Sequence, residues 1–285
     1  MEGATRANAR PNLLVMPGLL FLGLFFVLPY MWMLAISFME RSYEEPYIFV
    51  GTLEHYAWVL QDGFGWEIMA LTFGFASVTA IATLILGYPL AYFMARSGSR
   101  TRGILLALVL APLLVGVVIR SYGWMILLAD TGLVNQFLEW VGIGKLKLMY
   151  NETGVWIGLI HIYLPFMIIS LMNAISGIDP ELERASRSLG ASGWTTFWRV
   201  TWPLSLPGVA AGATLVFVLG VSAYVIPTLL GGYNVLTSPL LVVQMVIDLF
   251  NWPLGSAMAM VLFAATIGVI IAFNAVMGRA TRRLS

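Results

Sequence analysis

The stretch DPELERASRSLGASGWTTFWRVTWPLSLPG, from Asp179 to Gly208, differs in composition from the chain around it. The 285-residue chain is 60% hydrophobic and 10% charged, and its mean hydropathy of +0.88 lies outside the range of soluble domains. In the quoted stretch, polar, aromatic and helix-breaking residues follow one another closely. The sequence therefore predicts a membrane protein with a structured polar insert between two apolar segments.

Six apolar stretches are long enough to cross a bilayer as helices, since a span needs roughly 20 residues. They are Leu13–Phe38, Ile68–Met94, Ile104–Leu128, Val155–Ile175, Gly208–Leu230 and Gly255–Met277. None alternates with a period of two residues, so we predict an all-α polytopic membrane protein rather than a β-barrel. The first stretch is too long for a signal peptide and is expected to be a retained span. We expect one membrane domain over residues 13–278, a polar loop at 176–207, and tails at 1–12 and 279–285.

Basic residues indicate the orientation of the chain. The two tails, the loop after the second stretch and the polar insert contain Arg6, Arg10, Arg96, Arg100, Arg102, Arg184, Arg187, Arg199, Arg279, Arg282 and Arg283. The other loops contain only Arg41, Lys145 and Lys147, with most of the acidic residues. Because Lys and Arg accumulate on the cytoplasmic side, we predict that both termini and the insert are cytoplasmic. In an outer loop, the apolar spacing of Thr131–Ile143 favours a short amphipathic surface helix over a plain loop.

The insert is predicted to form two short helices. Asp179 can cap the first helix, Pro180–Leu189, and Gly190 can end it in the left-handed conformation. A second helix is expected from Gly193 to about Thr201, before two prolines break the path ahead of the fifth span. Its aromatic stripe consists of Trp194, Phe197, Trp198 and Trp202, and the prolines are Pro203 and Pro207.

Two interpretations of the insert remain open on periodicity alone. It is either an amphipathic loop that rests on the membrane, with tryptophans among the headgroups, or a docking element for a soluble partner. Ordering two capped helices costs conformational entropy that a simple connector does not require.

The insert resembles the signature loop of permease subunits of binding-protein-dependent ABC importers. That pattern reads Glu-Ala-Ala, three residues, Gly, nine residues, Ile, one residue, Leu-Pro. The matching positions here are Arg184-Ala185-Ser186, Gly190, Val200, Trp202 and Pro203. Arg184 stands where the family has a glutamate that pairs with the ATPase, and Glu183 could replace that glutamate only if the helix turned by roughly 100°.

Other stretches are similar to permeases of spermidine/putrescine-type importers, a group that also carries other small organic solutes and iron. They are LAPLLVGVVIRSYGWMILL, GLVNQFLEWVGI, YVIPTLLGG and FNWPLGSAMA, so the resemblance covers nearly the whole chain. It implies the type I importer permease fold, six transmembrane helices and a cytoplasmic coupling-helix loop. It also implies import of a polyamine, or alternatively of an amino-acid-like solute, an opine, a phosphonate or ferric iron.

The resemblance further implies an assembly in the bacterial inner membrane. A second permease chain, expected to be a paralogue, would complete the pathway, and an extracytoplasmic binding protein would deliver the solute. Two cytoplasmic ATPases would use ATP and Mg²⁺, while this chain would bind no cofactor, metal or nucleic acid and would not be an enzyme. The residues expected to couple it to an ATPase are Glu181, Glu183, Arg184, Ala185, Ser186, Leu189, Gly190, Ala191, Trp194, Phe197, Trp198 and Pro203.

Polar residues within the spans are candidates for the solute path. They are Arg120, Tyr122, Trp124, His161, Tyr163, Asn173, Ser222 and Tyr224. Arg120 could instead anchor the chain at the membrane interface, and the others could form interhelical hydrogen bonds. The predicted spans contain no Asp or Glu, and Arg120 would repel a cation. A polyamine path would therefore need acidic residues from the partner permease, or its lining would have to be one that does not attract the solute.

Two other function classes are weighed against this one. An ion-coupled secondary transporter would usually show intramembrane carboxylates and repeated halves. An intramembrane enzyme would need a nucleophile–base pair or a metal site, and only Ser222 and His161 offer themselves, without a nucleophile motif. The chain has no cysteine, its two histidines lie far apart, and it contains no phosphate-binding loop of the form G-x-x-x-x-G-K-[ST].

Overall fold

The computed structural model describes residues 15–42 and 47–282, and the predicted N-terminal tail of residues 1–12 lies outside them. Over these residues, six helices are long and apolar enough to span a membrane, and extended pairing is limited to one bridge between Glu40 and Ile48. The predicted all-α architecture with six transmembrane helices is therefore confirmed. These six segments are Met16–Ile36, Gly63–Arg96, Val117–Trp140, Glu152–Ser176, Gly193–Val221 and Trp252–Arg279, and a turn at residues 129–132 divides the third of them into two helices.

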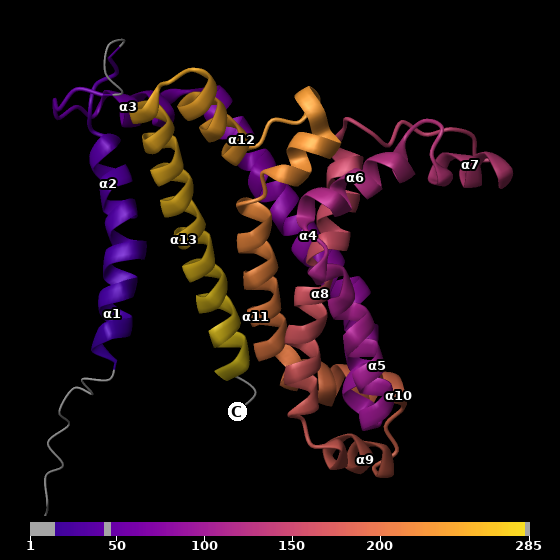
Figure 1. Cartoon of the computed structure of the whole chain (residues 1–285). Coiled ribbons are helices and arrows are strands. Elements are labelled where there is room, and N and C mark those ends of the chain that lie inside the picture. The colour runs from indigo at the N-terminus through magenta and orange to yellow at the C-terminus, as the bar shows by residue number, and fades with distance from the viewer. Residues whose placement is uncertain (1–14, 43–46, 283–285) are drawn as a thin grey trace, which may run out of the picture. The chain divides into compact units, whose positions relative to one another are not determined.

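The described chain forms two compact units (Figure 1). One comprises the chain up to Gln61 together with Val242–Val261, and the other comprises Asp62–Leu241 together with the residues from Leu262 onward. The elements of the first unit are α1 (Met16–Leu22), a π-helical turn (Gly23–Val27), α2 (Leu28–Ile36), α3 (Glu54–Gln61) and a second π-helical turn (Gln244–Asp248). Helix α13 (Trp252–Arg282) begins in the first unit and ends in the second.

Three helices form the core of the second unit: α4 (Gly63–Arg96), α8 (Glu152–Ser176) and α11 (Trp202–Val221). They pack side by side in Figure 1. Small residues allow the close approach, since a Cβ added at Gly220 of α11 would lie 2.9 Å from the Cα of Ala76 in α4. Phe75, Leu159 and Leu171 are fully buried in this core.

The third predicted span, Ile104–Leu128, is not a single helix. The chain forms α5 (Ser99–Leu110), a 3₁₀ turn (Ala111–Leu114) and then α6 (Val117–Leu128), with extended backbone at Val115 and Gly116. Pro112 has no backbone N–H to donate to the preceding turn, which favours a break here. Because the sequence stays apolar through the break, hydropathy alone does not indicate it.

The fifth predicted span, Gly208–Leu230, is displaced. The helix is continuous from Gly193 to Val221, passing from α10 (Gly193–Thr196) through a π-helical turn (Phe197–Thr201) into α11. The expectation that Pro203 and Pro207 would break the chain is therefore wrong. Each proline removes only one backbone donor, and a helix still leaves the fewest unsatisfied backbone groups in apolar surroundings.

The segment after α11 contains structure that hydropathy did not predict. A π-helical turn (Pro227–Gly231), a 3₁₀ turn (Gly232–Asn234) and α12 (Ser238–Val243) follow in close succession. The helical segments Pro227–Asn234 and Ser238–Asp248 are bent by 83° at their break, as in a broken span or re-entrant loop. The hydroxyl of Thr72 in α4 accepts a 2.8 Å hydrogen bond from the Ser238 amide and so holds the start of α12.

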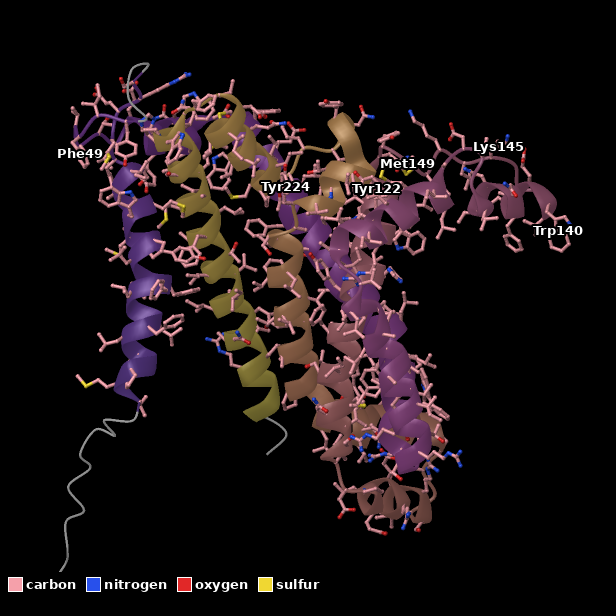
Figure 2. The ribbon with its side chains drawn as sticks, in the orientation of Figure 1. Phe49, Tyr122, Trp140, Lys145, Met149 and Tyr224 are labelled. Carbon is pink, nitrogen blue, oxygen red and sulfur yellow. The ribbon has the colours of Figure 1, made fainter. Side chains whose placement is uncertain are left out.

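The predicted outer helix within Thr131–Ile143 is present as α7 (Leu133–Trp140). The side-chain Nδ2 of Asn135 donates to the backbone carbonyls of Ala129 and Leu146, which fixes the turns on both sides of α7. Trp140, at the end of α7, projects away from the helical core of its unit (Figure 2). Helix α7 and the polar insert lie at opposite ends of this unit in Figure 1.

Candidate functional site

The polar insert begins with helix α9 (Pro180–Ser188), and its ends form as the sequence predicts. The Asp179 carboxylate accepts a 2.9 Å hydrogen bond from the Glu181 amide, and Pro180 occupies the first turn. Gly190 adopts a φ of +88°, which favours glycine, and its amide donates to the Arg187 carbonyl. A residue with a Cβ would be strained at Gly190, so the end of α9 depends on this glycine.

Helix α10 follows directly and is fixed to α9 by side chains. The Ser192 hydroxyl caps α10 by accepting a hydrogen bond from the Thr195 amide at 3.2 Å. The hydroxyls of Ser186 in α9 and buried Thr196 in α10 are 3.1 Å apart. Because α10 continues into α11, the insert is the direct extension of a membrane helix.

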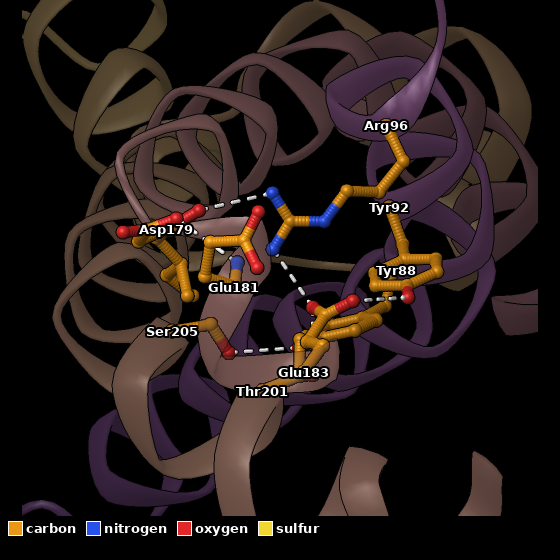
Figure 3. A network of polar contacts seen from close by, with 9 residues as sticks. Tyr88, Tyr92, Arg96, Asp179, Glu181, Glu183, Thr201 and Ser205 are labelled. Carbon is orange, nitrogen blue, oxygen red and sulfur yellow. Dashed lines mark hydrogen bonds and ion pairs between the residues drawn. The ribbon is translucent and has the colours of Figure 1, made fainter. Parts of the chain in front are cut away.

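Glu183 connects α9 to the helical core. Its side chain is buried, and its Oε1 accepts hydrogen bonds from Arg96 Nη2 at 2.7 Å and from the Thr201 hydroxyl at 3.0 Å. Its Oε2 accepts from the Tyr92 hydroxyl at 3.0 Å, and Arg96 also donates to the Ile178 carbonyl at 3.0 Å (Figure 3). The carboxylate therefore joins α9 to the C-terminal end of α4 and to the turn that leads into α11.

The environment keeps Glu183 charged. Burial alone would raise the pKa of this carboxyl, but the hydrogen bonds from Arg96, Thr201 and Tyr92, together with the Arg96 charge, outweigh it. The pKa of Glu183 consequently lies below its ordinary value of 4.5. At neutral pH, Glu183 and Arg96 form an ion pair whose other donors and acceptors are largely satisfied within the same chain.

The surface of α9 divides into two faces. The anchored face, Glu183 and Ser186, points into the chain. The free face consists of Leu182, Ala185 and Leu189; all three are exposed, and Leu189 is 90% exposed. No described residue covers the free face, so α9 presents apolar side chains that are free to contact another molecule.

Charged residues border the free face. Arg184 donates from Nη1 to Glu181 Oε1 at 2.6 Å, and both side chains are about two-thirds or more exposed, at 72% and 68%. Glu183 therefore does not take the exposed place of the family glutamate, because it points into the chain and the position itself is occupied by Arg184.

The aromatic stripe of the second helix has a partly buried and an exposed end. Phe197 and Trp202 contact the ring of Tyr88 in α4, with centroids 5.4 and 5.5 Å apart. Trp194 stacks on Phe197 and is 71% exposed, and Trp198 is also exposed. The stripe thus holds α10 against α4 and leaves two tryptophans at the surface beside α9.

The structure brings some of the candidate path residues together. Trp124 Nε1 donates to His161 Nδ1 at 3.0 Å, which joins α6 to α8. Arg120 interacts electrostatically with both His161 and Tyr163. Tyr122 lies on the same helix but lines a separate hollow of about 440 Å³ with Asp130 and Lys147, among other residues.

The remaining path candidates lie apart from that cluster. Asn173 is exposed near the C-terminal end of α8. Ser222 donates to the Leu219 carbonyl at the end of α11, and Tyr224 is exposed just beyond it (Figure 2). Over the described residues, no group of three or more His, Asp or Glu residues could hold a metal ion.

Sequence reasoning missed the partners of Glu183. Tyr88, Tyr92 and Arg96 follow one another at a spacing of four residues and so share one face of α4. Tyr88 belongs to the same region, with its hydroxyl 2.8 Å from that of Ser205 in α11. This row of polar residues at the end of an apolar helix is the sequence signal that could have indicated a polar contact. Arg96 was used only to predict the orientation of the chain in the membrane.

Residues 87–285 match the model of a protein family described as "Binding-protein-dependent transport system inner membrane component". The chain belongs to this family. The permease is 35% identical over 242 residues to the spermidine/putrescine transport system permease protein PotB of Escherichia coli (strain K12), which covers 84% of this chain and 87% of that protein. It is 34% identical to PotB of Haemophilus influenzae, over 90% of this chain and 91% of that protein.

Solved structures show the same fold at lower identity. A bacterial ABC transporter involved in the import of alginate superposes on the permease with a TM-score of 0.74 and 17% identity, over 93% of this chain and 94% of that chain. An inward-facing MetNI methionine ABC transporter has a TM-score of 0.58 and 18% identity, over 80% and 99% of the two chains. The permease is therefore a multi-pass membrane component of an importer and not an enzyme, as predicted.

Proposed function

We propose that the permease imports a polyamine such as spermidine or putrescine from an extracytoplasmic binding protein into the cytoplasm. The observation that carries the solute assignment is the similarity to PotB, at 34–35% identity over 84–90% of the chain. The six apolar helices provide one side of the membrane path, and a second permease chain, a paralogue, provides the other. The cluster of Arg120, Trp124, His161 and Tyr163 belongs to this path.

The polar insert docks on a cytoplasmic ATPase in this proposal. The exposed free face of α9 and the exposed Trp194 and Trp198 support this role. The anchored face supports transmission, because Glu183 connects α9 to α4 and to the segment that continues into α11. Movement of a docked α9 therefore reaches two core helices through a single carboxylate. Both termini and the insert lie on the cytoplasmic side, in agreement with the distribution of arginines.

Each coupling candidate has a place in this scheme. Leu182, Ala185, Leu189 and Trp194 contact the ATPase, and Arg184 and Glu181 border that contact. Ser186 and Phe197 hold the insert to the permease, and Gly190 and Ala191 form the turn between α9 and α10. Pro203, which follows the π-helical turn, allows the same helix to enter the membrane.

One experiment tests the solute and the ATPase together. The permease is purified from mild detergent with its associated subunits, reconstituted in proteoliposomes, and supplied with the binding protein. We expect an ATPase and a second permease chain to co-purify, and spermidine or putrescine to stimulate ATP hydrolysis and enter the vesicles. Co-purification without uptake of any polyamine would contradict the solute, whereas absence of an ATPase would contradict the docking role.

A second solute class is favoured by one property of the sequence. The six predicted apolar spans contain no Asp or Glu to attract a polycation, and the one charge within them is the cation Arg120. A small organic solute with an anionic group suits these spans better, because Arg120 would attract it. Examples are an amino-acid-like compound, an opine or a phosphonate. The same vesicles, loaded with such solutes in turn, distinguish it from a polyamine.

A further inference from the structure

Arg120 is a charged side chain without a counter-charge among the described residues. Its Nε and Nη1 atoms are covered by neighbouring atoms, and neither has a hydrogen-bond partner among the described residues. The electrostatic interactions of its guanidinium are with Tyr163 and His161, and no described carboxylate is among them. A guanidinium always carries its charge and five donors, so apolar surroundings favour it only when it is paired or faces water.

The groups beside Arg120 offer more donors than free acceptors. The Nδ1 atom of His161 accepts the 3.0 Å hydrogen bond from Trp124, so a neutral His161 carries its proton on Nε2 and can donate there. Tyr163 adds a phenolic hydroxyl, which donates readily to a charged oxygen. The Tyr163 oxygen is the one side-chain acceptor left among these three groups, so donors outnumber acceptors, and a carboxylate is the group that would satisfy these donors together.

The position of Arg120 on α6 favours the same kind of ligand. Arg120 lies in the first turn of α6, and Gly116 at the N-cap gives no side-chain cap to the free amides. The side chain of a helical residue leans toward the N-terminus of its helix, which directs the guanidinium toward these amides. The helix N-terminus carries a partial positive charge, so it repels Arg120 and would attract an anion placed between them.

We propose that Arg120, with His161 and Tyr163, binds a carboxylate that comes from outside this chain. Bidentate pairing of the guanidinium with a carboxylate provides the missing acceptors and neutralises the charge. Two sources share this chemistry: an acidic side chain of the second permease chain, and a carboxylate on the transported solute. The second source rests on the second solute class of the proposed function, because a polyamine carries no carboxylate. The first source rests on the chain having a partner chain in the membrane.

The experiment compares Arg120→Gln, Arg120→Lys and Arg120→Glu with the wild type in the complete transporter. Exposed Arg100, at the cytoplasmic start of α5, provides the matched control Arg100→Gln. Co-purification of the ATPase shows that each variant is folded, because the docking surface lies at the insert. Co-purification of the second permease chain and the KM of uptake are the two readouts.

We expect uptake by Arg120→Gln to fall at least tenfold and by Arg120→Glu further, while Arg120→Lys retains part of it because an ammonium cannot pair with both oxygens. If the partner chain supplies the carboxylate, Arg120→Glu weakens co-purification, and changing one membrane-embedded acid of the partner to Arg restores it. If the solute supplies the carboxylate, the KM for uptake of a carboxylated solute rises in Arg120→Gln. The KM for uptake of the ester of that solute is then the same in Arg120→Gln and the wild type.

Wild-type assembly and KM in both Arg120→Gln and Arg120→Glu would overturn the proposal. Where Arg120→Gln fails to fold, Arg120→Lys decides the question, since wild-type KM and assembly in that variant exclude bidentate pairing. Failure of the wild type to take up polyamines would contradict only the proposed solute. Whether an acidic residue of the partner chain supplies the carboxylate is then tested by co-purification of the second permease chain, which requires no solute.

Discussion

Two ion pairs of α9 lie only two residues apart and differ in almost every physical respect. Glu183 pairs with Arg96 across 87 positions of sequence, and the two side chains are 8% and 18% exposed. Glu181 pairs with Arg184 within α9, and both side chains are exposed to solvent. The buried pair fixes α9 to the core of the permease. The exposed pair leaves the helix surface accessible to another molecule.

The difference shows how a short helix can belong to two structures at once. A connector would need only one polar face, whereas α9 has an anchored face and a free face. A buried pair is strongly destabilised by loss of one partner, because the other charge remains unpaired, whereas an exposed pair contributes little. Changes on the two faces should therefore separate stability and coupling from docking.

The largest effect is expected from Glu183→Ala. The change leaves Arg96 without a carboxylate at a largely buried position, which should cost about 3 kcal/mol in the stability of the insert. We expect normal insertion into the membrane, ATP hydrolysis no longer coupled to transport, and uptake reduced more than tenfold. Uptake by proteoliposomes and ATPase activity measured in parallel check this.

The matched control is Glu181→Ala, which removes an exposed carboxylate from the same helix turn. It should change stability by less than about 0.5 kcal/mol. Normal substrate-stimulated transport by Glu183→Ala would show that the Arg96 pair does not transmit motion. The exchanged pair, Arg96→Glu with Glu183→Arg, should recover part of the coupling if charge pairing matters more than the surrounding hydroxyls.

The end of α9 should show the next largest effect. Gly190→Ala forces a side chain into a φ of +88° and should cost about 1 kcal/mol. Gly190→Pro should cost more because it also removes the N–H that donates a hydrogen bond to the Arg187 carbonyl. Gly193, whose φ is not positive and around which there is open space, provides the control Gly193→Ala. Hydrogen exchange of the insert and coupled transport measure both, and equal effects at the two glycines would contradict the proposed role of the turn.

A pH titration tests the buried pair without removing it. Because the pKa of Glu183 is below 4.5 in the folded protein, the pair stabilises the insert at pH values above about 4.5. That contribution is lost only as the pH falls through the lowered pKa of the folded state, when the carboxyl takes up a proton. We expect amide protection in α9 to be flat at neutral pH and to fall below pH 4.5. The variant Glu183→Gln should lack this step, and a step of the same size in it would assign the effect to another group.

The local features of the insert could be predicted from sequence, but its attachment could not. Asp179 and Gly190 act through their own backbone neighbours, so capping rules suffice for both ends of α9. The contact between Glu183 and Arg96 depends on how α4, α9 and α11 pack, which no local pattern encodes. The predicted break at Pro203 was wrong for a related reason. The rule that proline ends helices applies where water can satisfy the released backbone groups, and apolar surroundings offer no such water.

The smallest effect on stability, and the most informative on docking, is expected from Arg184→Glu. This change restores the residue that the family pattern has at this position. Both members of the exposed pair are solvated, so loss of the pair with Glu181 should change stability by less than about 0.5 kcal/mol. If the ATPase contacts the free face, its cognate surface is adapted to Arg184, and reversal of the charge should weaken co-purification of the ATPase severalfold. Loss of stability comparable to that of Glu183→Ala would contradict the division of α9 into two faces, since the free face would then support the fold as the anchored face does.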